Sequence, residues 1–84
     1  MRIILAEREA ELMGVLWEHG PSTVAEVRDR LADPLAYTSV LTMLRNLEAK
    51  GYVSHSAEGR SHRFSARISR DAAQRNAVRD LARK

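Results

Sequence analysis

The chain has 84 residues, 30% of them charged, with a formal net charge of +3, and this length favours a single small domain. Cysteine is absent, which excludes disulfides, thiolate catalysis and thiolate metal sites. No apolar run approaches the roughly 20 residues that a membrane helix needs, and the N-terminal apolar stretch is too short for a signal peptide, so we expect a cytoplasmic protein without a membrane partner.

The first predicted element is an amphipathic helix at Glu7–His19. Its apolar side chains recur with helical spacing, at Leu12, Met13, Leu16 and Trp17. We therefore expect Trp17 in the core rather than in a ligand pocket or stacking platform. Gly20-Pro21 ends the helix, because glycine favours a C-terminal cap and proline cannot continue the helix.

A second helix is predicted to begin at the capping box formed by Thr23 and Glu26. A threonine N-cap with a glutamate three residues later satisfies two backbone N–H groups that the helix itself leaves unbonded. We expect this helix to run to about Leu31. Asp33-Pro34 then breaks the chain, because the residue before a proline disfavours helical geometry.

A third helix, at Thr38–Lys50, has one apolar and one polar face, and Gly51 follows it as a C-terminal cap signal. The apolar side chains fall on one side, at Val40, Leu44 and Leu47. The opposite side carries short hydroxyls, an arginine and an amide, at Thr38, Ser39, Thr42, Arg45 and Asn46. Tyr37, just before the helix, is expected to pack under the turn, with a phosphate contact as the alternative.

A β-hairpin is predicted next, with strands at Tyr52–Ala57 and Ser61–Ala66 around a loop at Glu58-Gly59. A two-residue loop at these positions would place His55 directly opposite His62. Because side chains alternate along a strand, we expect Val53 and Phe64 to face the body of the domain.

Ser69 is the predicted N-cap of a last helix that runs to the end of the chain. The element order is therefore helix, helix, helix, hairpin, helix. This order is typical of an α+β, mainly α, winged helix-turn-helix with three helices, a wing of two or three strands and a C-terminal helix. We expect the winged domain at residues 1–67 and the C-terminal helix at residues 68–84.

Positive charge is concentrated in the second half of the chain. Residues 1–44 hold four basic and seven acidic side chains, whereas residues 45–84 hold ten basic and four acidic ones. Twelve of the fourteen basic residues are arginine, whose planar fork suits phosphates and guanine edges. This half favours a polyanionic partner through counterion release, although a solvated basic surface would have the same composition.

Several segments carry a resemblance to a known family. They are Glu9–Met13, Val15–Trp17, Gly20-Pro21, Thr23–Val27, Leu35–Thr42, Leu44, Leu47, Lys50-Gly51, Glu58–Arg60 and His62–Phe64. Through them the chain resembles the penicillinase-repressor family, which includes BlaI, MecI and copper-responsive relatives. The resemblance implies a bacterial transcriptional repressor that dimerises and binds a dyad-symmetric operator in double-stranded DNA. It also implies a regulatory protease as a partner, because several members are inactivated when a sensor-linked protease cuts them.

Three departures limit what the resemblance implies. Family members usually continue with helices that build the dimer interface, whereas this chain stops at Lys84, so we expect residues 68–84 to be the start of a dimerisation-type helix that is cut short. Ala6 stands where the family usually has a Ser or Thr cap. Copper-responsive members use a Cys-rich tail, which is missing here, so we expect no cofactor.

The candidate DNA-binding residues lie on the third helix and on the wing. Recognition helices place short or bidentate side chains near their N-terminus, within reach of base edges. The candidates are Thr38, Ser39, Thr42, Arg45 and Asn46 on the helix, and Arg60 and Arg63 on the wing. Arg45 suits a guanine edge or a phosphate, and Asn46 suits an adenine or a phosphate. The alternatives are a solvated helix face and, for the wing arginines, a cross-strand pair with Glu58.

Two other functions stay open at this point. The domain could be a winged-helix module for protein contact that uses the same helix face. It could also be a metal-responsive repressor that binds zinc through His55 and His62 with Glu48 or Glu58. A packed or solvent-facing histidine pair is favoured over zinc, because no other close-spaced ligand exists, so we assign no metal site. An enzyme is not expected, because the sequence has no phosphate loop, no recognisable nucleophile–base pair and no zincin motif.

Overall fold

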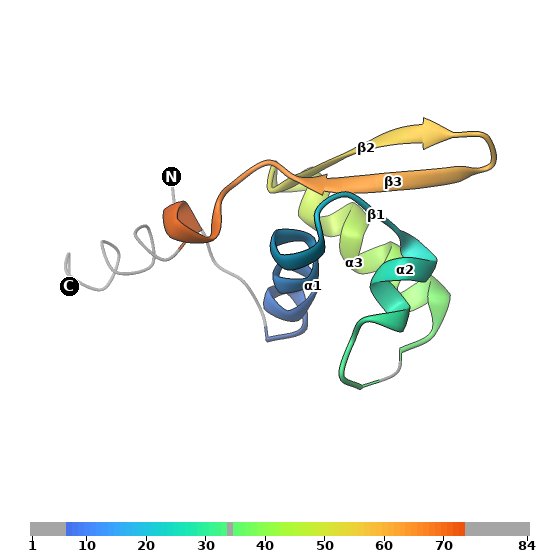
Figure 1. The fold of residues 1–84 in the computed structure, drawn as a ribbon, viewed down its shortest axis with the longest axis horizontal. Helices are drawn as coiled ribbons and strands as arrows, with labels where there is room; N and C mark the ends of the chain where they lie inside the picture. The colour runs from blue at the N-terminus through green and yellow to red at the C-terminus, as the bar shows by residue number, and fades with distance from the viewer. Residues whose placement is uncertain (1–6, 34, 74–84) are drawn as a thin grey trace.

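The computed structural model describes residues 7–33 and 35–73, and within them three helices pack with a three-stranded antiparallel sheet (Figure 1). In chain order the elements are α1 Glu7–His19, β1 Ser22–Thr23, α2 Val24–Asp29, α3 Tyr37–Ala49, β2 Val53–Glu58 and β3 Ser61–Ala66. The predicted winged helix-turn-helix is confirmed, and the sheet order β1-β3-β2 gives the wing its third strand. No helix in these ranges is long and apolar enough to cross a membrane.

The predicted capping box begins α2. Thr23 Oγ1 accepts a hydrogen bond from the Glu26 amide at 3.2 Å, and Glu26 Oε1 accepts one from the Thr23 amide at 2.8 Å. The helix ends at Asp29, earlier than the predicted end at Leu31. The last turn is tightened because the Arg30 amide donates to two carbonyls, those of Val27 at 3.1 Å and Glu26 at 3.2 Å.

A glycine cap ends α3, whose bounds of Tyr37–Ala49 lie one residue earlier at each end than predicted. Gly51 has a φ of +84°, which residues with a side chain rarely adopt. Its amide donates to the Glu48 carbonyl at 2.9 Å, and the Tyr52 amide donates to the Leu47 carbonyl at 3.0 Å. These two bonds form a Schellman motif that turns the chain directly into β2.

The hairpin loop is Gly59-Arg60 rather than the predicted Glu58-Gly59, so Glu58 pairs with Ser61 and lengthens β2. Gly59 has a φ of +59° at the first loop position, as a type II′ turn requires. The prediction was wrong because a loop of Glu58-Gly59 would need a positive φ at Glu58 as well as at Gly59, whereas Gly59-Arg60 needs it only at the glycine.

This change of loop moves the strand pairing by two residues. His55 lies opposite Phe64 instead of opposite His62 as predicted. Because side chains alternate with a period of two, the change leaves each residue on its expected face. Val53 and Phe64 are accordingly buried, as predicted.

The core lies between the three helices and the inner face of the sheet. Its most deeply buried apolar side chains are Leu12, Met13, Val27, Val40, Leu44, Leu47 and Phe64. Trp17 packs against this core as expected, and its indole Nε1 donates to the Ile68 carbonyl at 2.8 Å. The segment after β3 is thereby held against α1.

The predicted N-cap of the last helix is confirmed at Ser69. Its Oγ accepts a hydrogen bond from the Ala72 amide at 3.0 Å, and residues 70–73 are helical. The rest of this predicted helix lies outside the described residues. The helix start and the tip of the β2–β3 hairpin lie at opposite ends of the described structure (Figure 1).

Candidate nucleic-acid interface

The candidate residues of α3 share one solvent-facing side of the helix, which we call the polar face of α3. Its members are Thr38, Ser39, Thr42, Arg45 and Asn46, of which Ser39 is partly buried and the others are exposed. The opposite side is fully buried against the core through Val40, Leu44 and Leu47. The core contacts of α3 therefore determine which polar side chains the helix presents.

The N-terminal part of the polar face carries the short side chains of Thr38, Ser39 and Thr42, so a ligand can come close to the α3 backbone there. Thr42 Oγ1 donates a hydrogen bond to the Thr38 carbonyl at 2.9 Å. This bond uses the hydroxyl hydrogen, so Thr42 offers a methyl group and acceptor lone pairs rather than a donor. A thymine methyl is a suitable partner for such a side chain.

Arg45 and Arg60 are exposed, and neither forms an ion pair or a side-chain hydrogen bond within residues 7–33 and 35–73. Other cations, such as Arg8 and Lys50, form ion pairs with glutamates of α1. An unpaired guanidinium can bind an anion without giving up a native partner. Arg67, at the base of the hairpin, is also exposed and unpaired in this part of the chain, although no sequence pattern distinguished it from the other arginines.

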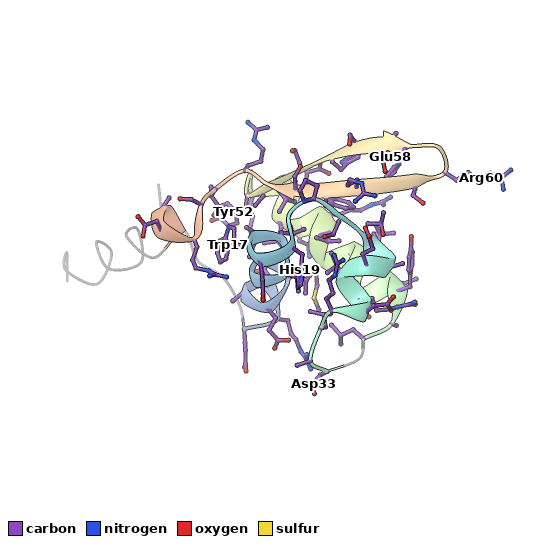
Figure 2. The ribbon with its side chains drawn as sticks, viewed as in Figure 1. Trp17, His19, Asp33, Tyr52, Glu58 and Arg60 are labelled. Carbon is purple, nitrogen blue, oxygen red and sulfur yellow. The ribbon has the colours of Figure 1, made fainter. Side chains whose placement is uncertain are left out.

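Arg60 lies at the tip of the wing. It is the second residue of the turn, and its side chain extends away from the body of the domain (Figure 2). The third strand β1 pairs only with Arg63 and Phe64 of β3, so the tip projects as a two-stranded ribbon. Arg60 is therefore presented to solvent at the far end of the projecting ribbon.

Arg63, the other wing candidate, is engaged within the domain. Its Nε donates to Glu58 Oε2 at 2.9 Å, which is the cross-strand pair weighed as an alternative from the sequence. Its Nη1 donates to the Pro21 carbonyl at 3.1 Å and to Glu26 Oε1 at 3.2 Å. Hydrogen bonding and charge from Glu58 raise the pKa of Arg63, with a smaller contribution from Glu26.

Tyr37 does not pack under the turn, so that expectation is wrong. It is the first residue of α3, and 47% of its surface is exposed. The guanidinium carbon of Arg28, from α2, lies 6.0 Å from the centroid of its ring. The phenol is thus exposed at the start of α3 and lies against Arg28, so the phosphate contact weighed as the alternative stays open for Tyr37.

The rings of the two wing histidines, His55 and His62, lie in contact at a tilt of 32°, with their centroids 4.8 Å apart. The Nδ1 atom of His55 also forms a hydrogen bond with the Glu48 carboxylate of α3. Among the residues that the structure describes, no group of three or more His, Cys, Asp or Glu side chains is arranged to hold a metal ion. The zinc-responsive alternative therefore gains no support from the geometry.

Two helices joined by a turn, a third helix packed with them and an adjacent β-hairpin define a winged helix-turn-helix protein. The family model for the penicillinase repressor matches residues 5–84, and the chain belongs to this family. It is a family of repressors, in agreement with the expectation that the chain is not an enzyme.

Individual relatives agree with this assignment. The chain is 36% identical over 70 residues to the transcriptional regulator BlaI from two strains of Mycobacterium tuberculosis. The match covers 80% of this chain and 51% of the relative, so the chain spans about half the length of these curated relatives. The solution structure of the DNA-binding domain of the repressor BlaI superimposes with a TM-score of 0.72 at 29% identity, over 86% of this chain and 93% of that one. AbfR of Staphylococcus epidermidis shares the fold, with a TM-score of 0.67 at 21% identity over 88% of this chain and 50% of that one.

Proposed function

We propose that the domain binds duplex DNA sequence-specifically and is the reading part of a transcriptional repressor. The observation that carries the proposal is the polar face of α3, which presents short hydroxyls, an amide and the unpaired Arg45 on the side opposite the core. The names of the relatives support it, because a similar solved domain is described as the DNA-binding domain of a repressor. A curated relative is likewise described as a transcriptional regulator.

In this proposal α3 enters the major groove and the wing contacts the flanking backbone. Arg45 bonds a guanine edge or a phosphate, and Asn46 bonds an adenine or a phosphate. Thr38, Ser39 and Thr42 let the helix approach closely and contact thymine methyls or phosphates. Arg60 reaches a phosphate or a narrow minor groove beside the site read by α3.

We further propose that two copies act together on a dyad-symmetric operator. One recognition helix contacts only a few base pairs, so two symmetric readers are needed for useful specificity. Sedimentation of the chain with and without a palindromic duplex measures this pairing. Cleavage by a sensor-linked protease, which family membership suggests, is the proposed route of induction.

The proposal is tested by selecting duplexes from a random-sequence pool with the wild-type chain and titrating the selected duplex in a mobility-shift assay. We expect an enriched sequence with dyad symmetry and an affinity that falls as salt is raised. Failure to bind any duplex at low salt would contradict the proposal.

Chemical-shift mapping with the same duplex separates DNA binding from the protein-contact alternative. We expect the largest changes at Thr38–Asn46 and at the wing tip. A protein-contact module predicts no changes on this helix segment when duplex DNA is added, so that outcome would favour the alternative.

A further inference from the structure

Arg63 occupies the centre of the three-stranded sheet, on its outer face. It lies on β3 opposite Ser56 of β2 on one side and opposite Thr23 of β1 on the other. Its side chain is about one-third exposed, at 33%. From this position the guanidinium reaches both edges of the sheet.

The partners of Arg63 belong to two different parts of the domain. Glu58 is the last residue of β2, at the projecting end of the hairpin. Pro21 lies in the turn after α1, and Glu26 lies in the first turn of α2. The Oε1 atom of Glu26 that accepts from Arg63 also closes the capping box with the Thr23 amide. One guanidinium therefore connects the wing to the helix-turn-helix.

The projecting end of the wing needs such a connection. β1 pairs with β3 only at Ser22–Phe64 and Thr23–Arg63, so residues 57–62 have no third strand beside them. An isolated two-stranded ribbon twists and bends easily. The direction of the hairpin tip relative to α2 and α3 therefore depends on contacts at the last fully paired position, which is Arg63.

We propose that Arg63 is a positioning residue that sets the angle of the wing, so that Arg60 and α3 engage one DNA site together. This inference rests on the proposed DNA-binding function and replaces the simple phosphate contact expected for Arg63. A phosphate contact through Nε or Nη1 would require the guanidinium to leave two carboxylates and a carbonyl, because these three N–H groups already donate within the domain. The Glu58 and Glu26 carboxylates beside it would also repel a phosphate.

Salt dependence distinguishes positioning from contact. The duplex selected by the wild-type chain is titrated over a range of salt concentrations with Arg63→Ala and with Arg60→Ala. A phosphate contact contributes about one unit to the slope of log affinity against log salt. We expect Arg60→Ala to lower this slope by about one, whereas Arg63→Ala weakens binding on the order of tenfold and leaves the slope unchanged.

Arg63→Lys is the second variant, and it keeps the charge without the fork. Lysine can replace arginine at a single phosphate, but one ammonium cannot bond Glu58, Pro21 and Glu26 in the same geometry. We expect Arg63→Lys to bind as weakly as Arg63→Ala. Thermal midpoints of both variants, and the helical signal in circular dichroism, establish that the compared proteins are folded.

The Nε–Hε resonance of Arg63 gives a readout that does not depend on a variant. We expect it to be visible in the free domain, because Glu58 accepts the hydrogen bond, and to move little when the duplex is added, while that of Arg60 shifts. A slope lowered by one in Arg63→Ala, full binding by Arg63→Lys, or a large shift of the Arg63 resonance would each overturn the inference. If wild type binds no duplex, the proposed function fails instead, and the two failures are thereby distinguished.

Discussion

At the scale of single residues, the proposed DNA surface contains side chains that are free and side chains that are already bonded. Arg45 and Arg60 have no side-chain partner in the described ranges, whereas Thr42 uses its hydroxyl hydrogen and Arg63 its Nε and Nη1 hydrogens within the domain. A free donor reaches DNA without breaking a native bond, so it should contribute more to affinity. Two arginines of the same wing therefore receive different roles because their surroundings differ.

Arg45→Ala should weaken binding of the selected duplex by about 1–3 kcal/mol and relax the base preference at one position. The reason is that Arg45 is the one long cationic side chain on the polar face of α3. Mobility-shift titration against duplexes with single base changes measures both effects. Arg67→Ala is the matched control, because it removes another exposed, unpaired arginine from the base of the hairpin and should leave the base preference intact. An unchanged preference in Arg45→Ala would restrict this residue to a backbone contact.

Thr42→Val should bind the selected duplex nearly as well as wild type, whereas Thr42→Ser should bind more weakly by about 1 kcal/mol. The Thr42 hydroxyl hydrogen is bonded to the Thr38 carbonyl, which leaves the methyl group as the most distinctive part of the side chain. Valine keeps a methyl at that position and serine removes it. The reverse order of affinities in the same titration would show that the hydroxyl reads the DNA.

At the scale of elements, the start of α2 depends on Glu26, whose carboxylate accepts hydrogen bonds from two different parts of the domain. Glu26 Oε1 accepts from the Thr23 amide and from Arg63 Nη1. The backbone bond from Thr23 is the largest cause that lowers the pKa of Glu26, and the charges of Arg63 and Arg30 add to it. The ionised carboxylate therefore stabilises both the helix and the attachment of the wing.

Stability should fall in acid through Glu26. Because its pKa in the folded state lies below the ordinary value of 4.5, the unfolded chain binds this proton more readily. The stabilisation is complete above pH 4.5 and is lost as the pH falls through the lower, folded-state pKa. We expect the thermal midpoint of Glu26→Gln to drop less than that of wild type between neutral pH and this acid range.

Glu18→Gln is the control for this comparison, because Glu18 is an exposed carboxylate of α1 outside the capping box. It should show the same acid-induced drop as wild type. If Glu26→Gln and wild type lost thermal stability in parallel, the carboxylate of Glu26 would have no special role in the pH dependence.

At the scale of the whole molecule, two long-range contacts join distant segments to α1. Lys50 Nζ, at the C-terminal end of α3, bonds the largely buried Glu9 carboxylate at 2.9 and 3.0 Å. The indole of Trp17 bonds the Ile68 carbonyl, just before the last helix begins. Through these contacts α1 supports both α3 and the segment that leads out of the wing.

Trp17→Phe should destabilise the domain by about 1 kcal/mol, because phenylalanine keeps apolar packing but leaves the Ile68 carbonyl without its donor. Denaturant unfolding measures the loss, and amide hydrogen exchange should show reduced protection at residues 70–73. Arg70→Ala is the control: it removes the guanidinium carbon that lies 5.4 Å from the indole centroid and leaves the Trp17 hydrogen bond in place. Equal stability of wild type and Trp17→Phe would mean that the bond contributes nothing.

Most of the fold could be predicted because its signals are local. The bounds of α1 follow from an apolar stripe and the Gly20-Pro21 stop, and α2 begins at a capping box whose two residues are three apart. The polar face of α3 was predictable because helical periodicity alone separates Arg45 from the buried side formed by Val40, Leu44 and Leu47.

The loop of the hairpin was within reach of such local reasoning, whereas the environment of Tyr37 was not. A loop of Glu58-Gly59 would need a positive φ at Glu58, whereas Gly59-Arg60 confines it to the glycine, so the turn rule alone favours the observed loop. Tyr37 has both an apolar ring and a polar hydroxyl, and its exposure depends on how α2 and Arg28 meet the start of α3.

The sequence by itself determined the order of the elements, their caps and the solvent-facing side of α3, since these depend on residues within a few positions of one another. The tertiary structure alone decided that Arg60 is free and that Arg63 is bound. Arg63 bonds Pro21 and Glu26, which precede it by 42 and 37 residues, because the pairing of β1 with β3 brings them together. A guanidinium can bind either a phosphate or a carboxylate. In the folded domain the carboxylates of Glu58 and Glu26 already bind that of Arg63.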